Sequence, residues 1–194
     1  MPPLIDARYS GALLGRYLLA SRRGHPEGGQ VLACRLDTIS PQMLTAHAPV
    51  AGQVGEEVDA SFEPFGLLRG RLRHVTRSGF AMSIEVSDED RYILSRRIEW
   101  HARHQPVERR SNQRLLPDNP HSVLLLGDGT SCPCLILNMS SSGAAVSADL
   151  RPPIGTPLAL GRTLGRVARR TDIGFAMRFL ADQPEKQLEL LLHL

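Results

Sequence analysis

Short runs of β-branched and apolar residues, separated by turn-forming residues, cover most of the chain and predict strands. In the first half these runs are residues 17–21, 31–36, 57–62, 71–75 and 80–86. In the second half they are residues 122–126, 134–138, 143–148, 156–161, 164–170 and 174–180. About six strands per hundred residues are typical of a small barrel or sandwich, and a closed barrel leaves no strand edge exposed.

A helix is predicted after the last strand of each half. Residues 88–100 follow Ser87, a candidate N-cap with Asp90 three residues later. The apolar face expected for this helix is Tyr92, Ile93, Leu94, Ile98 and Trp100. In the second half, Asp182, Pro184 and Glu185 occupy the places of a cap, an early proline and a third-position acid before residues 187–194.

The chain contains an internal repeat, which indicates two domains of the same fold. Residues 70–82, GRLRHVTRSGFAM, align without gaps with residues 165–177, GRVARRTDIGFAM, at an offset of 95. The two segments share Gly, Arg, Thr and the whole Gly-Phe-Ala-Met block. We therefore expect a mainly β protein of two tandem six-stranded barrels, each followed by a C-terminal helix, with domains at residues 1–104 and 105–194.

Composition narrows the class of protein. The 194 residues are 42% hydrophobic and 22% charged, which is ordinary for a globular protein, and no apolar run is long enough to span a bilayer. The net charge of +3 does not by itself indicate a nucleic-acid partner. We expect a cytoplasmic protein without membrane insertion, in which Cys34, Cys132 and Cys134 are reduced strand residues.

Between the two repeats, residues 105–118 carry several arginines, two prolines and little apolar material, as a linker does. Arg110 and Arg114 are four residues apart, so they point the same way in a helix and also in an extended strand, where they are separated by about 13 Å. Such a pair can hold both ends of a compact dianion. The alternative is a solvated linker in a chain whose only lysine is Lys186.

A second motif follows at the end of a predicted strand. Asn138-x-Ser140-x-x-Gly143 begins 24 residues after Arg114. Short polar side chains at a strand end can bind a base edge or a phosphate, and glycine permits a turn or a close backbone approach. Taken alone, the same residues could form an ordinary β-turn.

Together, Arg110-x-x-x-Arg114, Asn138-x-Ser140-x-x-Gly143 and the strand ending GFAMRF resemble the PilZ family of cyclic di-GMP receptors over residues 109–180. This resemblance implies that Arg110, Arg114, Asn138, Ser140 and Gly143 bind cyclic di-GMP, with Arg109 as a third arginine contact. Guanidinium groups suit this ligand because they form forked hydrogen bonds to phosphate and to the O6/N7 edge of guanine. One or two stacked ligand molecules are both compatible with the motif.

The first repeat resembles a degenerate copy of the same barrel. Laying residues 34–37 over 134–138 places Asp37 at Asn138, Ile39 at Ser140 and Gln42 at Gly143, and no Arg-x-x-x-Arg precedes them. We expect no ligand there, and a role in dimerisation, in partner contact or as the part that the switch moves.

Other chemistry is less well supported. His101 and His104 are spaced for a helical metal site, but no acidic or cysteine cluster completes it. Asp128-Gly129 is typical of a hairpin turn, and no nucleophile and base are paired, so we expect no metal, no cofactor and no enzyme activity. Single-stranded nucleic-acid binding would suit the basic pI but lacks aromatic platforms, since aromatic residues are 5% of the chain.

The function expected from the sequence is that of a cytoplasmic cyclic di-GMP receptor. Without ligand, the repelling arginines of residues 105–114 should be mobile, because they lack apolar neighbours to offset the entropy of ordering. Ligand binding should order this linker and reorient the two domains toward an unidentified downstream protein, with a homodimer also possible. The alternative is a PilZ-like protein-interaction module that binds no nucleotide.

Overall fold

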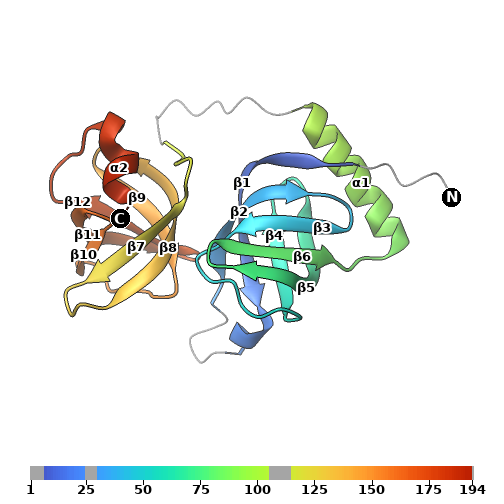
Figure 1. Cartoon of the computed structure of the whole chain (residues 1–194), viewed down its shortest axis with the longest axis horizontal. Helices are drawn as coiled ribbons and strands as arrows, with labels where there is room; N and C mark the ends of the chain where they lie inside the picture. Colours follow the sequence, from blue (N-terminus) through green and yellow to red (C-terminus); the bar gives the residue numbers. More distant parts are fainter. Residues whose placement is uncertain (1–6, 25–29, 105–114, 194) are drawn as a thin grey trace. The chain divides into compact units, whose positions relative to one another are not determined.

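The computed structural model describes residues 7–24, 30–104 and 115–193, which form two compact units, Met1–Arg109 and Arg110–Leu194. Each unit is a closed antiparallel β-barrel with its own helix (Figure 1). The domain boundary expected between residues 104 and 105 lies where the described part of the first unit ends, because residues 105–114 are outside the described residues. No helix in the described part of the chain has the length and hydropathy needed to cross a membrane.

The first barrel has six strands. They are β1 (Tyr9–Leu19), β2 (Leu32–Ile39), β3 (Met43–His47), β4 (Glu57–Phe62), β5 (Gly66–Thr76) and β6 (Gly79–Ile84). Their order around the barrel is β1-β2-β3-β6-β5-β4, and pairing of β1 with β4 closes it. A short 3-10 helix, Ala20–Arg22, follows β1. Of these six strands, β3 was not predicted from the sequence.

The second barrel repeats this arrangement. Its strands are β7 (His121–Leu126), β8 (Ser131–Ser140), β9 (Gly143–Ala148), β10 (Pro157–Leu160), β11 (Thr163–Thr171) and β12 (Gly174–Phe179). The order β7-β8-β9-β12-β11-β10, closed by β10 on β7, is that of the first barrel. The predicted fold of two six-stranded barrels, each followed by a helix, is confirmed.

The repeat extends to the irregularities of the strands. In the first barrel, β-bulges lie between Leu36 and Thr38 and between Leu72 and His74. In the second they lie between Ile136 and Asn138 and between Val167 and Arg169. A bulge bends its strand and re-aims side chains, so both barrels bend these strands at the same places, whereas a further shift between Ser10 and Leu13 occurs only in the first.

Alternating side chains fill each barrel. The largest fully buried side chains of the first core include Tyr17, Phe62, Leu72 and Met82, and those of the second include Leu124 and Phe175. Cys34 and Cys134 are buried in β2 and β8, Cys132 is half-buried, and all three are free thiols, as predicted. Burial raises the pKa of the Cys34 and Cys134 thiols, so both stay protonated at neutral pH.

Helix α1 (Asp88–Arg103) follows the first barrel. The Ser87 hydroxyl accepts a hydrogen bond from the Asp90 amide at 3.1 Å, which confirms the predicted cap. The predicted apolar face is only partly right, because Leu94, Ile98 and His101 are buried. Tyr92, Ile93 and Trp100 are exposed instead. Residues 94, 98 and 101 lie on one side of a 3.6-residue helix, and the other apolar residues fall beside that stripe.

The helix of the second barrel is shorter than its sequence suggests. A 3-10 turn, Glu185–Gln187, precedes α2 (Leu188–Leu192), and neither has a side-chain cap, so the predicted cap at Asp182 is wrong. Leu188 and Leu192, one turn apart, are buried in the second core. The Ser122 hydroxyl donates to the Leu192 carbonyl, which ties the end of the helix to β7.

Gly174 allows β12 to approach β9 closely. A Cβ at this position would collide with the Val146 carbonyl oxygen, and Gly79 has the same relation to Ala46 in the first barrel. Gly174→Ala is therefore expected to lower the free energy of unfolding of the second barrel by roughly 1–3 kcal/mol. Chemical denaturation checks this, with Gly127→Ala as the control because a Cβ there meets nothing within 4 Å. Equal stability of the two variants would contradict the close approach.

Candidate functional site

The second signature motif lies where β8 passes into β9. Asn138 and Ser140 are at the end of β8, and Gly143 begins β9. The Ser140 hydroxyl donates to the Gly143 carbonyl at 3.3 Å, so it closes the turn. The Asn138 side chain is half-buried and has no hydrogen-bond partner among the described residues, which leaves its amide available to a ligand. Arg109, Arg110 and Arg114 lie outside the described residues.

Strand pairing places two rows of residues next to each other on the outside of the barrel, and each row begins at a residue of the motif. The first row crosses β8, β9, β12 and β11 through Asn138, Ala145, Ala176 and Arg169. The second crosses the same strands through Ser140, Gly143, Arg178 and Arg166. Each row thus runs from a short polar side chain over small residues to one or two arginines.

The small residues make a shallow floor. The depression has a volume of about 240 Å³, and its lining includes Asn138, Ser140, Ala145, Arg169 and Arg178. A Cβ on Gly143 would collide with the Met177 carbonyl oxygen, so the close contact between β9 and β12 requires glycine at this position of the motif. A flat aromatic ligand could lie on this floor without displacing protein side chains.

The arginines of the two rows lack carboxylate partners. Arg169 and Arg178 are exposed and make no ion pair or hydrogen bond with any described residue. Arg166 donates only to the Gly155 carbonyl, at 3.2 Å. Three cations therefore gather toward one end of the rows and remain free to bind an anion.

Sequence reasoning missed these three arginines as candidate contacts. Arg166, Arg169 and Arg178 were seen only as members of repeated strands. Their place opposite Asn138 and Ser140 follows from the order β8-β9-β12-β11, in which sequence-distant strands are adjacent. The sequence does show these arginines within two predicted strands. It does not show that these strands lie next to the Asn-x-Ser-x-x-Gly motif.

The first barrel has a different register from the one expected. Thr38 pairs with Thr45 as Asn138 pairs with Ala145, and Ile39 pairs with Leu44 as Met139 pairs with Ala144. The equivalents of Asn138, Ser140 and Gly143 are therefore Thr38, Ser40 and Met43, not Asp37, Ile39 and Gln42. The expected alignment was one residue off because it laid four residues over five, whereas both strands have the bulge at the same place and Asp37 corresponds to Leu137.

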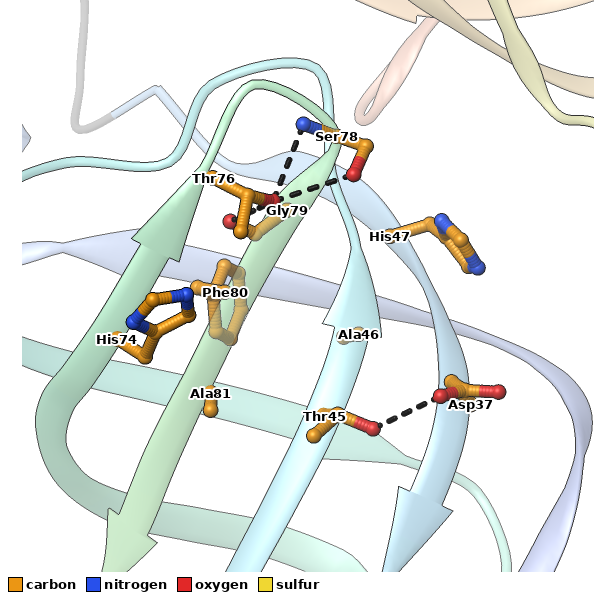
Figure 2. Close-up of a pocket in the computed structure, with 10 residues that line it drawn as sticks. All are labelled: Asp37, Thr45, Ala46, His47, His74, Thr76, Ser78, Gly79, Phe80 and Ala81. Carbon is orange, nitrogen blue, oxygen red and sulfur yellow. Dashed lines mark hydrogen bonds between the residues drawn. The ribbon is translucent and has the colours of Figure 1, made fainter.

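The corresponding place on the first barrel is a smaller pocket of about 190 Å³, and its lining carries larger side chains (Figure 2). Thr45 stands where the second barrel has Ala145, and its hydroxyl donates to Asp37 at 3.1 Å. The same hydroxyl lies 2.8 Å from the Thr38 hydroxyl, so the polar group that replaces Asn138 is already engaged. His74 replaces Arg169 at the end of the row.

The two barrels also differ in how one arginine position is charge-compensated. In the first, Arg71 occupies the position of Arg166 and pairs with Glu57 at 2.7 Å and with Glu85 at 3.5 Å. The second barrel has Pro157 and Leu180 in place of these glutamates. The same strand position is thus neutralised in one barrel and left cationic in the other.

The histidines and the aspartate that were considered as metal or catalytic candidates take part in packing and in a turn. His101 packs against Tyr9 and Phe65 at ring distances of 4.9 and 5.5 Å, and burial lowers its pKa. His104 stacks on Trp100 instead of meeting His101. Asp128 accepts a hydrogen bond from the Thr130 amide at 2.8 Å within a hairpin turn, as predicted. The described residues contain no cluster of three or more metal-ligating side chains.

Comparisons with solved structures found chains that are similar to this one over most of its length. The chain is similar to Borreliella burgdorferi PlzA in complex with c-di-GMP, with 11% identity, a TM-score of 0.30, and coverage of 97% of this chain and 93% of that one. It is also similar to the Bacillus subtilis inhibitor of motility, MotI/DgrA, with 14% identity, a TM-score of 0.29, and coverage of 94% of each chain. No match was found among curated protein sequences.

The sequence itself matches the family model described as PilZ domain over residues 108–194. This range contains both the Arg-x-x-x-Arg and the Asn-x-Ser-x-x-Gly motifs together with all six strands of the second barrel. Residues 108–194 are therefore a PilZ domain, and the second unit of this chain belongs to the PilZ domain family.

Proposed function

We propose that the protein is a cytoplasmic cyclic di-GMP receptor, with the ligand held on the outer face of strands β8, β9, β12 and β11. The observation that carries the proposal is the depression that joins Asn138 and Ser140 to the unpaired Arg169 and Arg178 over a floor of small residues. The family match over residues 108–194 supports it. In the solved structures, PlzA of Borreliella burgdorferi is in complex with c-di-GMP, and so is MrkH of K. pneumonia.

The ligand chemistry suits the residues. A cyclic dinucleotide carries two phosphate charges and two guanine bases, so it needs cations, flat surfaces and polar groups that bind base edges. Asn138 and Ser140 supply the short polar groups, while Ala145 and Ala176 leave room for a base. Arg169 and Arg178 lower the electrostatic cost of bringing the anion to the barrel.

Arg109, Arg110 and Arg114 complete the proposed site from the other side. Each guanidinium can form two parallel hydrogen bonds to a phosphate or to the O6/N7 edge of guanine and can stack on a base, which a lysine cannot do. Arg110 and Arg114 hold the ligand against the Asn138–Gly143 turn, and Arg109 is the third arginine contact.

Signalling follows from where these arginines are in the chain. Residues 105–114 connect the helix of the first barrel to the second barrel, so a ligand that fixes this segment also changes the freedom of the two units. The output of the receptor is an ordered linker and a reorientation of the barrels that a downstream protein detects. The first barrel acts as the body that is moved, because its threonine hydroxyls are hydrogen-bonded to each other and its arginine is paired with Glu57.

Arg114→Ala is expected to weaken cyclic di-GMP binding by at least about tenfold, because a charge-assisted hydrogen bond contributes roughly 1.5–3 kcal/mol. Titration calorimetry measures the affinity and the number of ligand molecules together. Arg71→Ala, in the repeat but outside both motifs, should bind as the wild type does. Unchanged affinity in the Arg114 variant would show that the ligand does not contact this arginine.

Ala145→Thr is expected to reduce affinity by at least about tenfold, because the added hydroxyl fills the floor and engages Asn138 as Thr45 engages Thr38. The matched control is Thr45→Ala in the first barrel, which should leave affinity unchanged. Calorimetry of both variants locates the ligand on one barrel. If Ala145→Thr binds normally while Thr45→Ala does not, the ligand is on the first barrel and the proposed site is wrong.

Saturating cyclic di-GMP is expected to slow proteolysis within residues 105–114, which contain three arginines that trypsin can cleave. The rate is followed by mass spectrometry of the released fragments, with GMP as the control ligand. Cleavage at Lys186 should not change. Equal rates with and without cyclic di-GMP would rule out ordering of the linker as the signal, even if calorimetry shows binding.

A further inference from the structure

Helix α1 exposes three large apolar side chains on the side away from its barrel. Tyr92, Ile93 and Trp100 have exposed fractions of 44%, 43% and 60%. They border a groove of about 390 Å³ that is also lined by Pro64 of the turn between β4 and β5. Since Leu94 and Ile98 already anchor the helix to the first core, these exposed residues are not needed to hold it in place.

This surface has the composition of an interface. Residues three, four, seven and eight apart share one side of a helix, so Tyr92, Arg96 and Trp100 form a line with Ile93 beside it. Tryptophan, tyrosine and arginine are the residue types that contribute most to protein interfaces. Contiguous exposed apolar area of this kind marks an interaction site more often than an isolated surface residue does.

The same side of α1 carries an acidic residue near its start and basic residues toward its end. Glu89 precedes Tyr92 by three residues, and Arg103 follows Trp100 by three residues, so opposite charges border the apolar line. At its centre, Arg96 is paired with Glu99 of its own chain at 3.0 Å. Glu99 also binds Arg103 at 2.6 Å, so one carboxylate is shared between two guanidinium groups and Arg103 is only partly neutralised.

We propose that this face of α1, formed by Glu89, Tyr92, Ile93, Arg96, Trp100 and Arg103, binds the same face of a second copy of the chain, with the two helices antiparallel. A twofold interface requires a surface that complements itself, so that each contact occurs twice. An acidic start and a basic end meet this requirement only when the helices run in opposite directions.

One register satisfies both the apolar and the charged positions. When Tyr92 lies against Trp100 of the second copy, Glu89 falls beside Arg103 of the second copy, because both steps are three residues long. The twofold axis then passes near Arg96, which forms an ion pair with Glu99 within each chain. Two aromatic contacts and two ion pairs result from one helix pair.

The length of α1 limits the interface area and therefore the affinity of the dimer. Sixteen residues extend about 24 Å, which is enough for a helix-pair interface of the small, reversible class. The dimer is therefore concentration-dependent, with dissociation in the micromolar range or weaker. Dimerisation through α1 leaves the outer face of the second barrel unused, so it is independent of nucleotide binding.

Sedimentation velocity of the full chain from micromolar to millimolar concentration tests the proposal. The wild type should change from monomer to dimer, and Trp100→Ala should weaken the dimer at least about tenfold. Because Trp100 is the only tryptophan, a concentration-dependent shift of the wild-type emission spectrum reports the same event. Circular dichroism checks that α1 is still folded in the variant.

A charge exchange identifies the partner as a second copy. Glu89→Arg and Arg103→Glu, each alone, should be monomeric at concentrations where the wild type dimerises. Mixing the two variants should restore a dimer, because both ion pairs then join an arginine of the first variant to a glutamate of the second. Glu185→Arg, an exposed reversal in the second unit, should dimerise as the wild type does.

A wild type that stays monomeric over the whole range would overturn the proposal. So would a dimer that is insensitive to Trp100→Ala, since it would use another surface. If the two charge variants do not dimerise on mixing, α1 is not paired with itself in this register and the proposal is wrong.

Discussion

Backbone pairing around a closed six-stranded barrel is the constraint on which the rest of the structure depends. Closure fixes which residues of distant strands are neighbours, and in both barrels the order is the same. It also forces β12 against β9 so closely that Gly174 has no room for a side chain, and Gly79 meets the same limit in the first barrel. The rows of outward-facing residues are a consequence of this pairing.

The same framework carries two different surfaces. On the second barrel, Ala145 leaves the floor open and Arg169 has no partner among the described residues. On the first, Thr45 stands in place of this alanine and is hydrogen-bonded to Asp37 and Thr38. The two surfaces thus differ by a few side chains on strands that follow the same order.

The ion pairs of the two surfaces also differ. Ion pairs with glutamates compensate the arginine of the first barrel's row, whereas proline and leucine stand in their place in the second. A cation without a neighbouring carboxylate attracts an anionic ligand more strongly, because binding does not require an existing ion pair to be broken. The nucleotide binding that we propose for the second unit and the self-association that we propose for α1 thus use different surfaces.

The sequence by itself determined the fold class, the repeat, the Ser87 cap and the Asn-x-Ser-x-x-Gly turn, because these depend on local periodicity and on short-range hydrogen bonds. It did not place Arg169 opposite Asn138, since that neighbourhood is created by strands far apart in the chain. It also misaligned Asp37, because the strand pairing that matches Thr38 with Asn138 is known only once the partner strands are known. Likewise, the exposure of Trp100 was decided by where α1 meets its barrel, and not by the periodicity of the helix.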